Sequence, residues 1–301
     1  MSRLGPIACV TVAAPEVQRM IDTYRLYLGY QLVDHGRVPA AQAQLWGRPS
    51  LAGRRYAIML PGGDGNTSLR FVESPPAPTY QPFLHMGWNA AEIMVQDTDA
   101  VAAKLVDSPF KVIGPPADLS FSDKIRAMQV LGPARESLYL TSFKEKMAEF
   151  DVPEAKHFVD RVFIVILGGK SAASVNEFYT QHFGVAKAQV IPAVISVISN
   201  AHGLAADTSH ELAALGLTGQ SFIEADSMPA ATQARGDIAA GELPPAIAMV
   251  SFGVDALPDT LQYLAPPQVL PQAPYQGCRA AVAVGSAGEL IELIERPRNA
   301  P

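Results

Sequence analysis

The sequence is poor in cysteine, which limits both its redox chemistry and its metal-binding options. Its two cysteines, Cys9 and Cys278, stand near opposite ends of the chain, and neither belongs to a CxxC or CxxH pattern. Disulfide-rich domains and structural zinc sites need several closely spaced cysteines or histidines. We therefore expect two free thiols, as in a reducing cytoplasm, and no sequence-local zinc site.

Long apolar runs and basic clusters are also missing. No stretch approaches the roughly 20 apolar residues that cross a bilayer, and the first residues lack the apolar core of a signal peptide. The formal net charge is −6, without a run of lysine and arginine. This composition argues against nucleic acid and membrane as partners and predicts a soluble, cytoplasmic protein that binds a small molecule.

What the 301 residues contain instead is an internal repeat. The segments 125–140 and 278–293 each combine an alternating run, a glycine turn and a second alternating run, which predicts a hairpin. The residues that coincide at a constant offset of 153 (279 − 126) are Arg126 with Arg279, Gly132 with Gly285 and Glu136 with Glu289. The two glutamates flank turns, so we expect both to be exposed. The offset predicts two tandem halves, 1–147 and 157–298.

A second repeated pattern is a strand followed by a helix that ends in Tyr-x-x-x-x-Gly. The expected strands at 7–12 and 162–167 each lead into apolar residues at helical spacing, and the helices end at Gly29 and Gly184. Three strand-like segments follow each helix. Further copies of this plan complete each half, so the chain is predicted to hold four strand–helix–three-strand modules.

This plan resembles the vicinal oxygen chelate superfamily, which includes glyoxalase I, bleomycin-resistance proteins and extradiol dioxygenases. The most specific motifs are Tyr-Arg-Leu-Tyr-Leu-Gly at 24–29, Phe-Tyr-Thr-Gln-His-Phe-Gly at 178–184 and the two closing hairpins. The resemblance covers nearly the whole chain. It implies an α+β fold in which four βαβββ modules form two tandem halves, each a curled mixed β-sheet cup with helices outside, as a monomer or homodimer.

In that superfamily, metal ligands project from inward positions on the first and last strands of two paired modules. The resemblance places these positions at Cys9, Arg70, Ala90 and Tyr139 in the first half, and at Ile164, Ile223 or Glu224, Met249 and Glu292 in the second. Arg70 is a fixed cation and Ala90 has no ligand atom. We therefore expect no metal and no other cofactor.

The first cup is predicted to hold the site. Because residues two apart on a strand share a face, its inward residues are expected to be Cys9, Thr11, Ser68, Arg70, Ala90, Glu92, Met94, Ser137, Tyr139 and Thr141. Glu92 interrupts an apolar strand and needs a partner, for which Arg70 is the available cation. One interpretation makes Glu92 the acid or base, Tyr139 a hydrogen-bond donor and Arg70 the substrate anchor. The other makes Arg70 and Glu92 a structural ion pair.

The remaining candidates surround this set. Cys9, Thr11, Ser68, Met94 and Thr141 are expected to contact substrate. His85 and Trp88 lie on a proline-rich connector that is expected to cover the cup mouth. In the second cup, Glu292 and Met249 are candidates for a separate site.

Three functions remain open at this stage. The leading hypothesis is a metal-independent lyase or isomerase that acts on a carbonyl- or carboxylate-bearing substrate. The alternatives are a non-catalytic ligand-binding protein of the resistance type and a metal-dependent extradiol dioxygenase or glyoxalase. The residues themselves do not identify the substrate.

Overall fold

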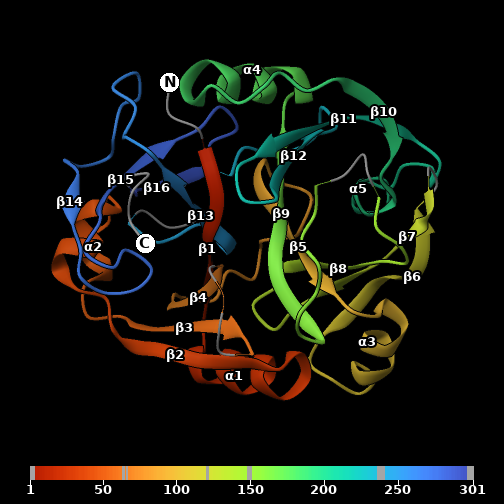
Figure 1. Ribbon diagram of the computed structural model, residues 1–301, viewed down its shortest axis with the longest axis horizontal. Coiled ribbons are helices and arrows are strands. Elements are labelled where there is room, and N and C mark those ends of the chain that lie inside the picture. The colour runs from red at the N-terminus through yellow and green to blue at the C-terminus, as the bar shows by residue number, and fades with distance from the viewer. Residues whose placement is uncertain are drawn as a thin grey trace.

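The computed structural model describes residues 4–62, 65, 67–119, 122–147, 151–235 and 241–296 and shows two eight-stranded mixed sheets. Figure 1 shows the two sheets side by side, each curled, with α1, α3 and α4 outside them. Sheet I has the strand order β14-β15-β16-β13-β1-β4-β3-β2, and sheet II has the order β10-β11-β12-β9-β5-β8-β7-β6. We call the concave face of sheet I cup I and that of sheet II cup II.

The strands of sheet I are β1 (Leu4–Ala14), β2 (Tyr30–Arg37), β3 (Arg55–Pro61), β4 (Ser68–Glu73), β13 (Ala246–Val254), β14 (Gln268–Val269), β15 (Arg279–Val284) and β16 (Leu290–Glu295). Those of sheet II are β5 (Gly87–Val95), β6 (Lys111–Leu119), β7 (Ser122–Leu131), β8 (Ser137–Phe143), β9 (Val159–Gly169), β10 (Val190–Val194), β11 (Ser209–Leu217) and β12 (Ser221–Ser227). The helices are α1 (Val17–Thr23) with its π-helical end (Tyr24–Leu28), α2 (Ala40–Leu45), a 3-10 turn (Pro49–Leu51), α3 (Thr98–Lys104), α4 (Ala172–Phe183) and α5 (Ser196–Ala201).

The α+β fold of four modules with curled mixed sheets is confirmed, but the modules pair differently from the expectation. In sheet I, β1 pairs antiparallel with β13, and in sheet II, β5 pairs antiparallel with β9. Each sheet therefore takes one module from each half of the sequence. The sequence repeat shows where each module begins and ends. It does not show which two modules share a sheet, because the first strand of every module has a similar edge for pairing. The ranges 1–147 and 157–298 describe the sequence duplication and not the two sheets.

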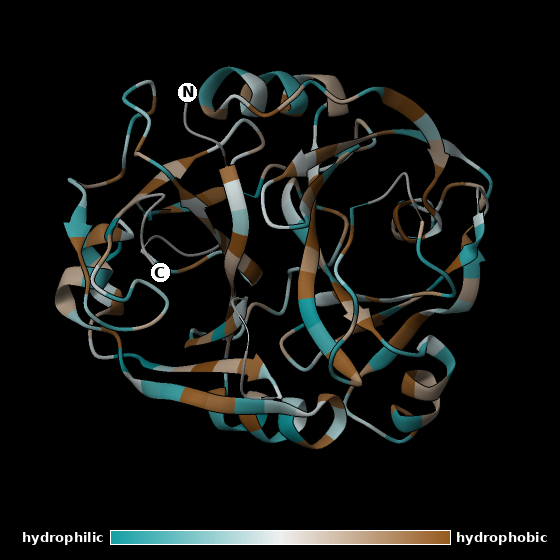
Figure 2. Cartoon of the chain, in the orientation of Figure 1, coloured by the Kyte–Doolittle hydropathy of each residue, from teal (hydrophilic) through white to brown (hydrophobic). Residues whose placement is uncertain are grey.

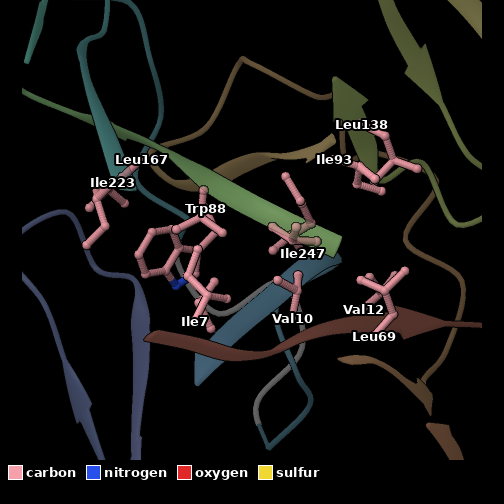
Figure 3. Packing of buried hydrophobic residues seen from close by; sticks show 14 of the residues in the cluster. Ile7, Val10, Val12, Leu69, Trp88, Ile93, Leu138, Leu167, Ile223 and Ile247 are labelled. Carbon is pink, nitrogen blue, oxygen red and sulfur yellow. The ribbon is translucent and has the colours of Figure 1, made fainter. Parts of the chain in front are cut away.

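The main core lies between the backs of the two sheets and under the outer helices. Val10 and Ile247 of sheet I face Ile93 and Leu167 of sheet II in this cluster (Figure 3). Figure 2 shows polar and apolar residues mixed along α1 and α4, which is typical of helices that cover a core on one side only. Among the described residues, no helix is long and apolar enough to cross a membrane.

Trp88 belongs to this core, so its expected place at a cup mouth is wrong. Its side chain is 1% exposed, and its indole Nε1 donates to the backbone oxygen of Leu290 at 2.8 Å. The pairing of β5 with β9 shifts register between Trp88 and Ala90. This irregularity places Trp88 in the core between the sheets, while Ala90, two residues later, belongs to the cluster of cup II.

Two equivalent tyrosine–glutamate pairs join the sheets. The hydroxyl of Tyr24 donates to Glu136 Oε1 at 2.8 Å, and the hydroxyl of Tyr179 donates to Glu289 Oε1 at 2.9 Å. Each tyrosine lies in the C-terminal part of a helix that covers one sheet, and each glutamate lies in a hairpin turn of the other sheet. Both glutamates were expected to be exposed, which is wrong, because they are 0% and 2% exposed. Burial raises the pKa of each to about 7.

Candidate functional site

The centre of cup I is a buried ion pair. Arg70 Nη2 from β4 lies 2.8 Å from Glu292 Oε2 from β16, and both side chains are 0% exposed. The indole of Trp46 and the hydroxyl of Tyr275 donate to Glu292 Oε1 at 2.8 and 2.6 Å. Arg70 also donates to Thr11 Oγ1 at 2.8 Å, and Ser251 donates to Glu292 Oε2. Both charged groups thus have several protein partners.

Two segments outside the module plan fill cup I. One is α2 with the turn after it, which lies between β2 and β3 in the sequence and places Trp46 in the cup. The other is the loop before β15, which places Tyr275 there. The Trp46 ring lies 4.7 Å from the Arg70 guanidinium carbon, a cation–π contact. The apolar residues packed with them are Leu45, Leu51, Ile58, Val72, Met249, Leu270 and Ile294. The concave face of sheet I is therefore a packed core.

The electrostatics of cup I favour two ionised groups. Burial opposes ionisation of Glu292, but Arg70 and three hydrogen-bond donors outweigh it and hold its pKa below the usual value. Burial likewise opposes the charge of Arg70, but Glu292, Tyr275 and Cys9 together outweigh it, so the arginine pKa is raised. Burial raises the pKa of the Cys9 thiol. Both cysteines are free.

A metal ion does not fit cup I. The four inward positions identified by the resemblance are occupied here by Cys9, Arg70, Met249 and Glu292. Arg70 places a guanidinium cation beside the one carboxylate of this set, and a second cation would be repelled. The predicted residues Thr11 and Ser68 also line this buried face, where Ser68 donates to the backbone oxygen of Ala8 at 3.3 Å.

The expected contact between Arg70 and Glu92 is not formed. Arg70 lies in sheet I and binds Glu292, whereas Glu92 lies on β5 in sheet II. The expectation assumed that the first two modules share a cup. Because module one pairs with module four, Glu292, which we had assigned to a separate site, is the partner of Arg70.

Cup II brings together the other predicted residues. Glu92 on β5 is in register with Tyr139 on β8, and Met94 with Thr141. On the other side of β9, Glu224 and Asp226 occupy alternate positions of β12, opposite Ile166 and Gly168. The side chains of Ala91, Ile93, Ile223 and Ala225 pack in the core behind the sheet. Their even-numbered neighbours on β5 and β12 therefore face the cup.

Cup II is less filled than cup I. Ile164, Phe222 and Glu224 on its concave face are each partly exposed. One part of the cup is covered by α5, whose Val197 and Ile198 belong to a small cluster with Phe83, Ala90, Tyr139, Ile166 and Met228. His85 contacts the connector itself, because its Nδ1 lies 3.2 Å from the backbone oxygen of Gln81 and its ring lies against Tyr80.

The acidic groups of cup II hold their protons unusually tightly. Burial raises the pKa of Glu92 and of Asp226 to about 7. Burial and the nearby Asp226 and Glu92 raise the pKa of Glu224. Burial, followed by the same three acids, raises the pKa of Tyr139, which stays a protonated donor. Tyr139 Oη, Ser137 Oγ and Asp226 Oδ1 are buried without a hydrogen-bond partner in the protein.

A single metal ion does not fit cup II either. The inward positions identified by the resemblance are Ala90, Tyr139, Ile164 and Glu224, which include one carboxylate. Within the described residues, no three histidine, cysteine, aspartate or glutamate side chains are grouped closely enough to hold a metal ion. Sequence reasoning missed Asp226, although its position two residues after Glu224 on a strand carried the signal.

One cavity lies beside cup II rather than inside it. It measures about 910 Å³ and is lined mainly by the charged segment that links the two halves of the sequence, including Glu145 and Lys156, with Arg161 of β9 beside it. Met94 lines both this cavity and the cup. The cavity does not include Glu92 or Tyr139, so we place the candidate site in the cup, where the unpartnered polar groups lie.

Comparison with known proteins identifies the fold. No family model and no curated protein sequence matches the chain. Among solved structures, glyoxalase I from Zea mays matches with a TM-score of 0.64 at 14% identity, over 98% of this chain and 92% of that one. A putative dioxygenase from Bacillus subtilis matches with a TM-score of 0.62 at 12% identity, over 97% of this chain and 85% of that one. The chain therefore shares its architecture with these proteins over nearly its whole length.

Proposed function

We propose that this chain, which has the vicinal oxygen chelate fold, is a small-molecule enzyme that uses cup II for metal-independent acid–base chemistry of the lyase or isomerase type. The observation that carries the proposal is the pairing of Glu92 with Tyr139. The two residues are neighbours across β5 and β8 on the concave face. The tyrosine hydroxyl has no protein partner there, so it is available to a ligand.

The proposed reaction begins with proton abstraction next to a carbonyl. The Glu92 carboxylate takes the proton, and the electron pair of the C–H bond moves into the carbonyl to form an enolate. The hydroxyl of Tyr139 donates a hydrogen bond to the enolate oxygen. In a β,γ-unsaturated carbonyl compound, return of the proton from Glu92 to the γ carbon of the dienolate shifts the double bond into conjugation and restores the carbonyl, which completes an isomerisation. In an elimination, the leaving group departs with its bonding pair and takes a proton from a second carboxyl group, for which Asp226 is the candidate.

The acidities of these groups suit the roles. A carboxyl group with a pKa near the working pH is populated in both forms and serves as base and then as acid. Glu92 and Asp226 both have a pKa of about 7. Because Arg70 is enclosed in cup I, a substrate carboxylate has no such anchor in cup II, and we now favour a carbonyl compound without a carboxylate.

The test is deuterium exchange in Glu92→Gln. Wild-type protein is incubated in D2O with a panel of small ketones and aldehydes, and loss of the proton signal next to the carbonyl is followed by NMR. We expect exchange with the wild type and a decrease of roughly 100-fold or more in Glu92→Gln, because general-base catalysis contributes on that scale. Glu177→Gln, on the exposed side of α4, is the matched control. Equal exchange in Glu92→Gln and wild type would remove Glu92 from the mechanism.

A ligand-binding protein without catalysis is the second candidate. It is favoured by the apolar wall of cup II, where Ile164 and Phe222 are partly exposed beside the acids. Saturable binding of a compound that is recovered unchanged, with no exchange, would support it. The proposed location is cytoplasmic, in keeping with the free thiols, and we propose a monomer or a homodimer.

A further inference from the structure

We propose that cup II selects organic cations, so that its ligand carries an ammonium or a similar nitrogen cation beside an apolar portion. This inference rests on the proposed function only for the location of the site in cup II, and it does not require that the protein catalyses a reaction. The residues that carry it are Glu92, Glu224 and Asp226, together with the partnerless hydroxyls of Ser137 and Tyr139 on β8, the strand next to Glu92.

The first observation is a set of acidic side chains on one concave face. Glu92 projects from β5, and Glu224 and Asp226 project from β12. They lie close enough for Glu224 to respond to both other acids. Asp226 is 1% exposed and Glu92 is 8% exposed, so solvent does little to stabilise their charges.

The second observation is independent of charge. Asp226 Oδ1, Ser137 Oγ and Tyr139 Oη are buried oxygens without a hydrogen-bond partner in the protein, on residues that are 1%, 1% and 9% exposed. Buried polar atoms in native proteins are nearly always hydrogen-bonded. Asp226 needs a donor, and an alkylammonium carries three N–H donors and no acceptor. A ligand of this class therefore satisfies both the charge and the hydrogen bonds.

Cup II does not supply this cation from its own residues. Within the described part of the chain, none of the three acids forms a salt bridge. His210 shares their face, but burial and the neighbouring His202 lower its pKa, and its Nε2 lies 2.9 Å from Ser199 Oγ. Lys111 is in register with Leu131 on the edge strand β6, where it is exposed.

Cup I provides the comparison. There the same fold buries one carboxylate, Glu292, and matches it with Arg70 from the neighbouring module. Cup II holds two buried carboxyl groups, Glu92 and Asp226, and the partly exposed Glu224, and no arginine or lysine forms an ion pair with them within the described ranges. When the acids of cup II ionise, a cationic ligand supplies the counter-ion that cup I carries internally.

The spacing of the acids favours an organic cation over a metal ion. Glu92 and Glu224 stand on strands separated by β9, which sets them about 10 Å apart across the sheet. Metal–oxygen distances of about 2.0–2.6 Å require ligands that converge far more closely. No such group exists among the described residues. An organic cation spans this distance, and its carbon skeleton contacts Ile164 and Phe222 on the intervening surface.

The experiment compares three probes of equal length: n-hexylamine, n-hexanol and sodium hexanoate. Each is titrated at pH 8 into wild-type protein, and binding is followed by NMR shifts of the cup II methyl groups and by calorimetry. We expect hexylammonium to bind at least tenfold more tightly than hexanol, and hexanoate not to bind. In Glu224→Gln/Asp226→Asn, the affinity for hexylammonium should fall at least tenfold, whereas Glu177→Gln should match wild type. If the double variant does not fold, each single variant is measured instead.

Other outcomes separate this inference from the proposed enzyme. Equal binding of hexanol and hexylammonium, or tighter binding of hexanoate, overturns the cation preference and leaves the acid–base function standing. Stoichiometric binding of Mg²⁺, Mn²⁺ or Zn²⁺ that is lost in the same variants shows that the acids hold a metal and also overturns the inference. If no probe perturbs cup II and Glu92→Gln leaves exchange unchanged, both proposals fall.

Discussion

Arg70 and Glu292 form a fully buried ion pair at 2.8 Å although 222 residues separate them in the chain. Arg70 lies on β4 of the first module and Glu292 on β16 of the fourth. Between them lie β1 and β13, so the pair spans the joint between the two modules of sheet I. It connects the ends of the sequence through the centre of a packed core.

Replacing Arg70 alone should destabilise the protein strongly. Arg70→Met leaves the Glu292 carboxylate buried without its counter-ion, and we expect a loss of about 3–5 kcal/mol in the free energy of unfolding. Arg70→Met/Glu292→Gln removes both charges and keeps an acceptor for Trp46 and Tyr275, so it should lose less than Arg70→Met. Urea denaturation of the two single variants and the double variant checks this. The idea of a structural ion pair would be contradicted if the double variant lost more free energy of unfolding than the two single variants lose together.

Shortening Trp46 should affect stability without affecting cup II. Trp46→Ala leaves a cavity in cup I and removes a donor to Glu292, and we expect a loss of about 3–5 kcal/mol. Binding of hexylammonium to cup II should match wild type at a temperature where both proteins are folded. Thermal unfolding and calorimetric titration measure the two effects separately. Altered binding in a folded Trp46→Ala protein would show that the cups are coupled.

Removing either inter-sheet hydroxyl should cost a similar amount. Tyr24→Phe and Tyr179→Phe each delete a donor to a buried glutamate, and we expect a loss of roughly 1–3 kcal/mol for each. Tyr27→Phe is the control on the same helical segment, because the hydroxyl of Tyr27 has no described hydrogen bond. Chemical denaturation gives the comparison. If the control loses as much as Tyr24→Phe, the hydrogen bond to Glu136 is not the cause.

The two buried glutamates should make the protein less stable as pH rises. Glu136 and Glu289 have a pKa of about 7 in the folded chain, against an ordinary value of 4.5. Between these values the folded state keeps a proton that the unfolded state releases, so the free energy of unfolding falls with increasing pH. Each group accounts for on the order of 3 kcal/mol between pH 4.5 and 8.

Urea denaturation at pH 5 and pH 8 measures this dependence. Glu136→Gln/Glu289→Gln should reduce this dependence by the share of the two groups, with Glu92 and Asp226 keeping theirs, whereas Glu177→Gln should leave it unchanged. The pKa of Glu292 is lowered from the ordinary glutamate value of 4.5. Its contribution to the free energy of unfolding is therefore lost only below pH 4.5 and does not change between pH 5 and pH 8. A wild-type protein that gains stability from pH 5 to pH 8 would show that the glutamates are not held protonated.

The sequence predicted the modules well because the repeat and the alternation of β-strands are local signals. The face assignment of Glu92, Met94, Tyr139 and Thr141 agrees with the structure. The pairing of modules was not predictable in the same way, since it depends on contacts such as β1 with β13, which lie far apart in the chain. The expected Arg70–Glu92 contact failed for this reason alone.

Other residues escaped prediction because their environment is built from distant segments. Glu136 and Glu289 follow turns, which ordinarily place charged side chains in water, but a tyrosine from the opposite sheet covers each one. Trp46 and Tyr275 lie in segments that the module plan treats as loops. A tryptophan after a short apolar helical stretch at 40–45 was the available signal that the loop folds inward.

The pairing of the first module with the fourth also sets an order in time during synthesis. β4 is complete at Glu73 and can pair with one edge of β1 early. The other edge of β1 has no native partner until β13 has been made at residues 246–254. Sheet II has all its strands by Ser227, whereas sheet I is complete only at Glu295. β1, although made before the other strands of sheet I, is thus among the last to be covered on both sides, and one of its edges is exposed to other chains throughout that interval.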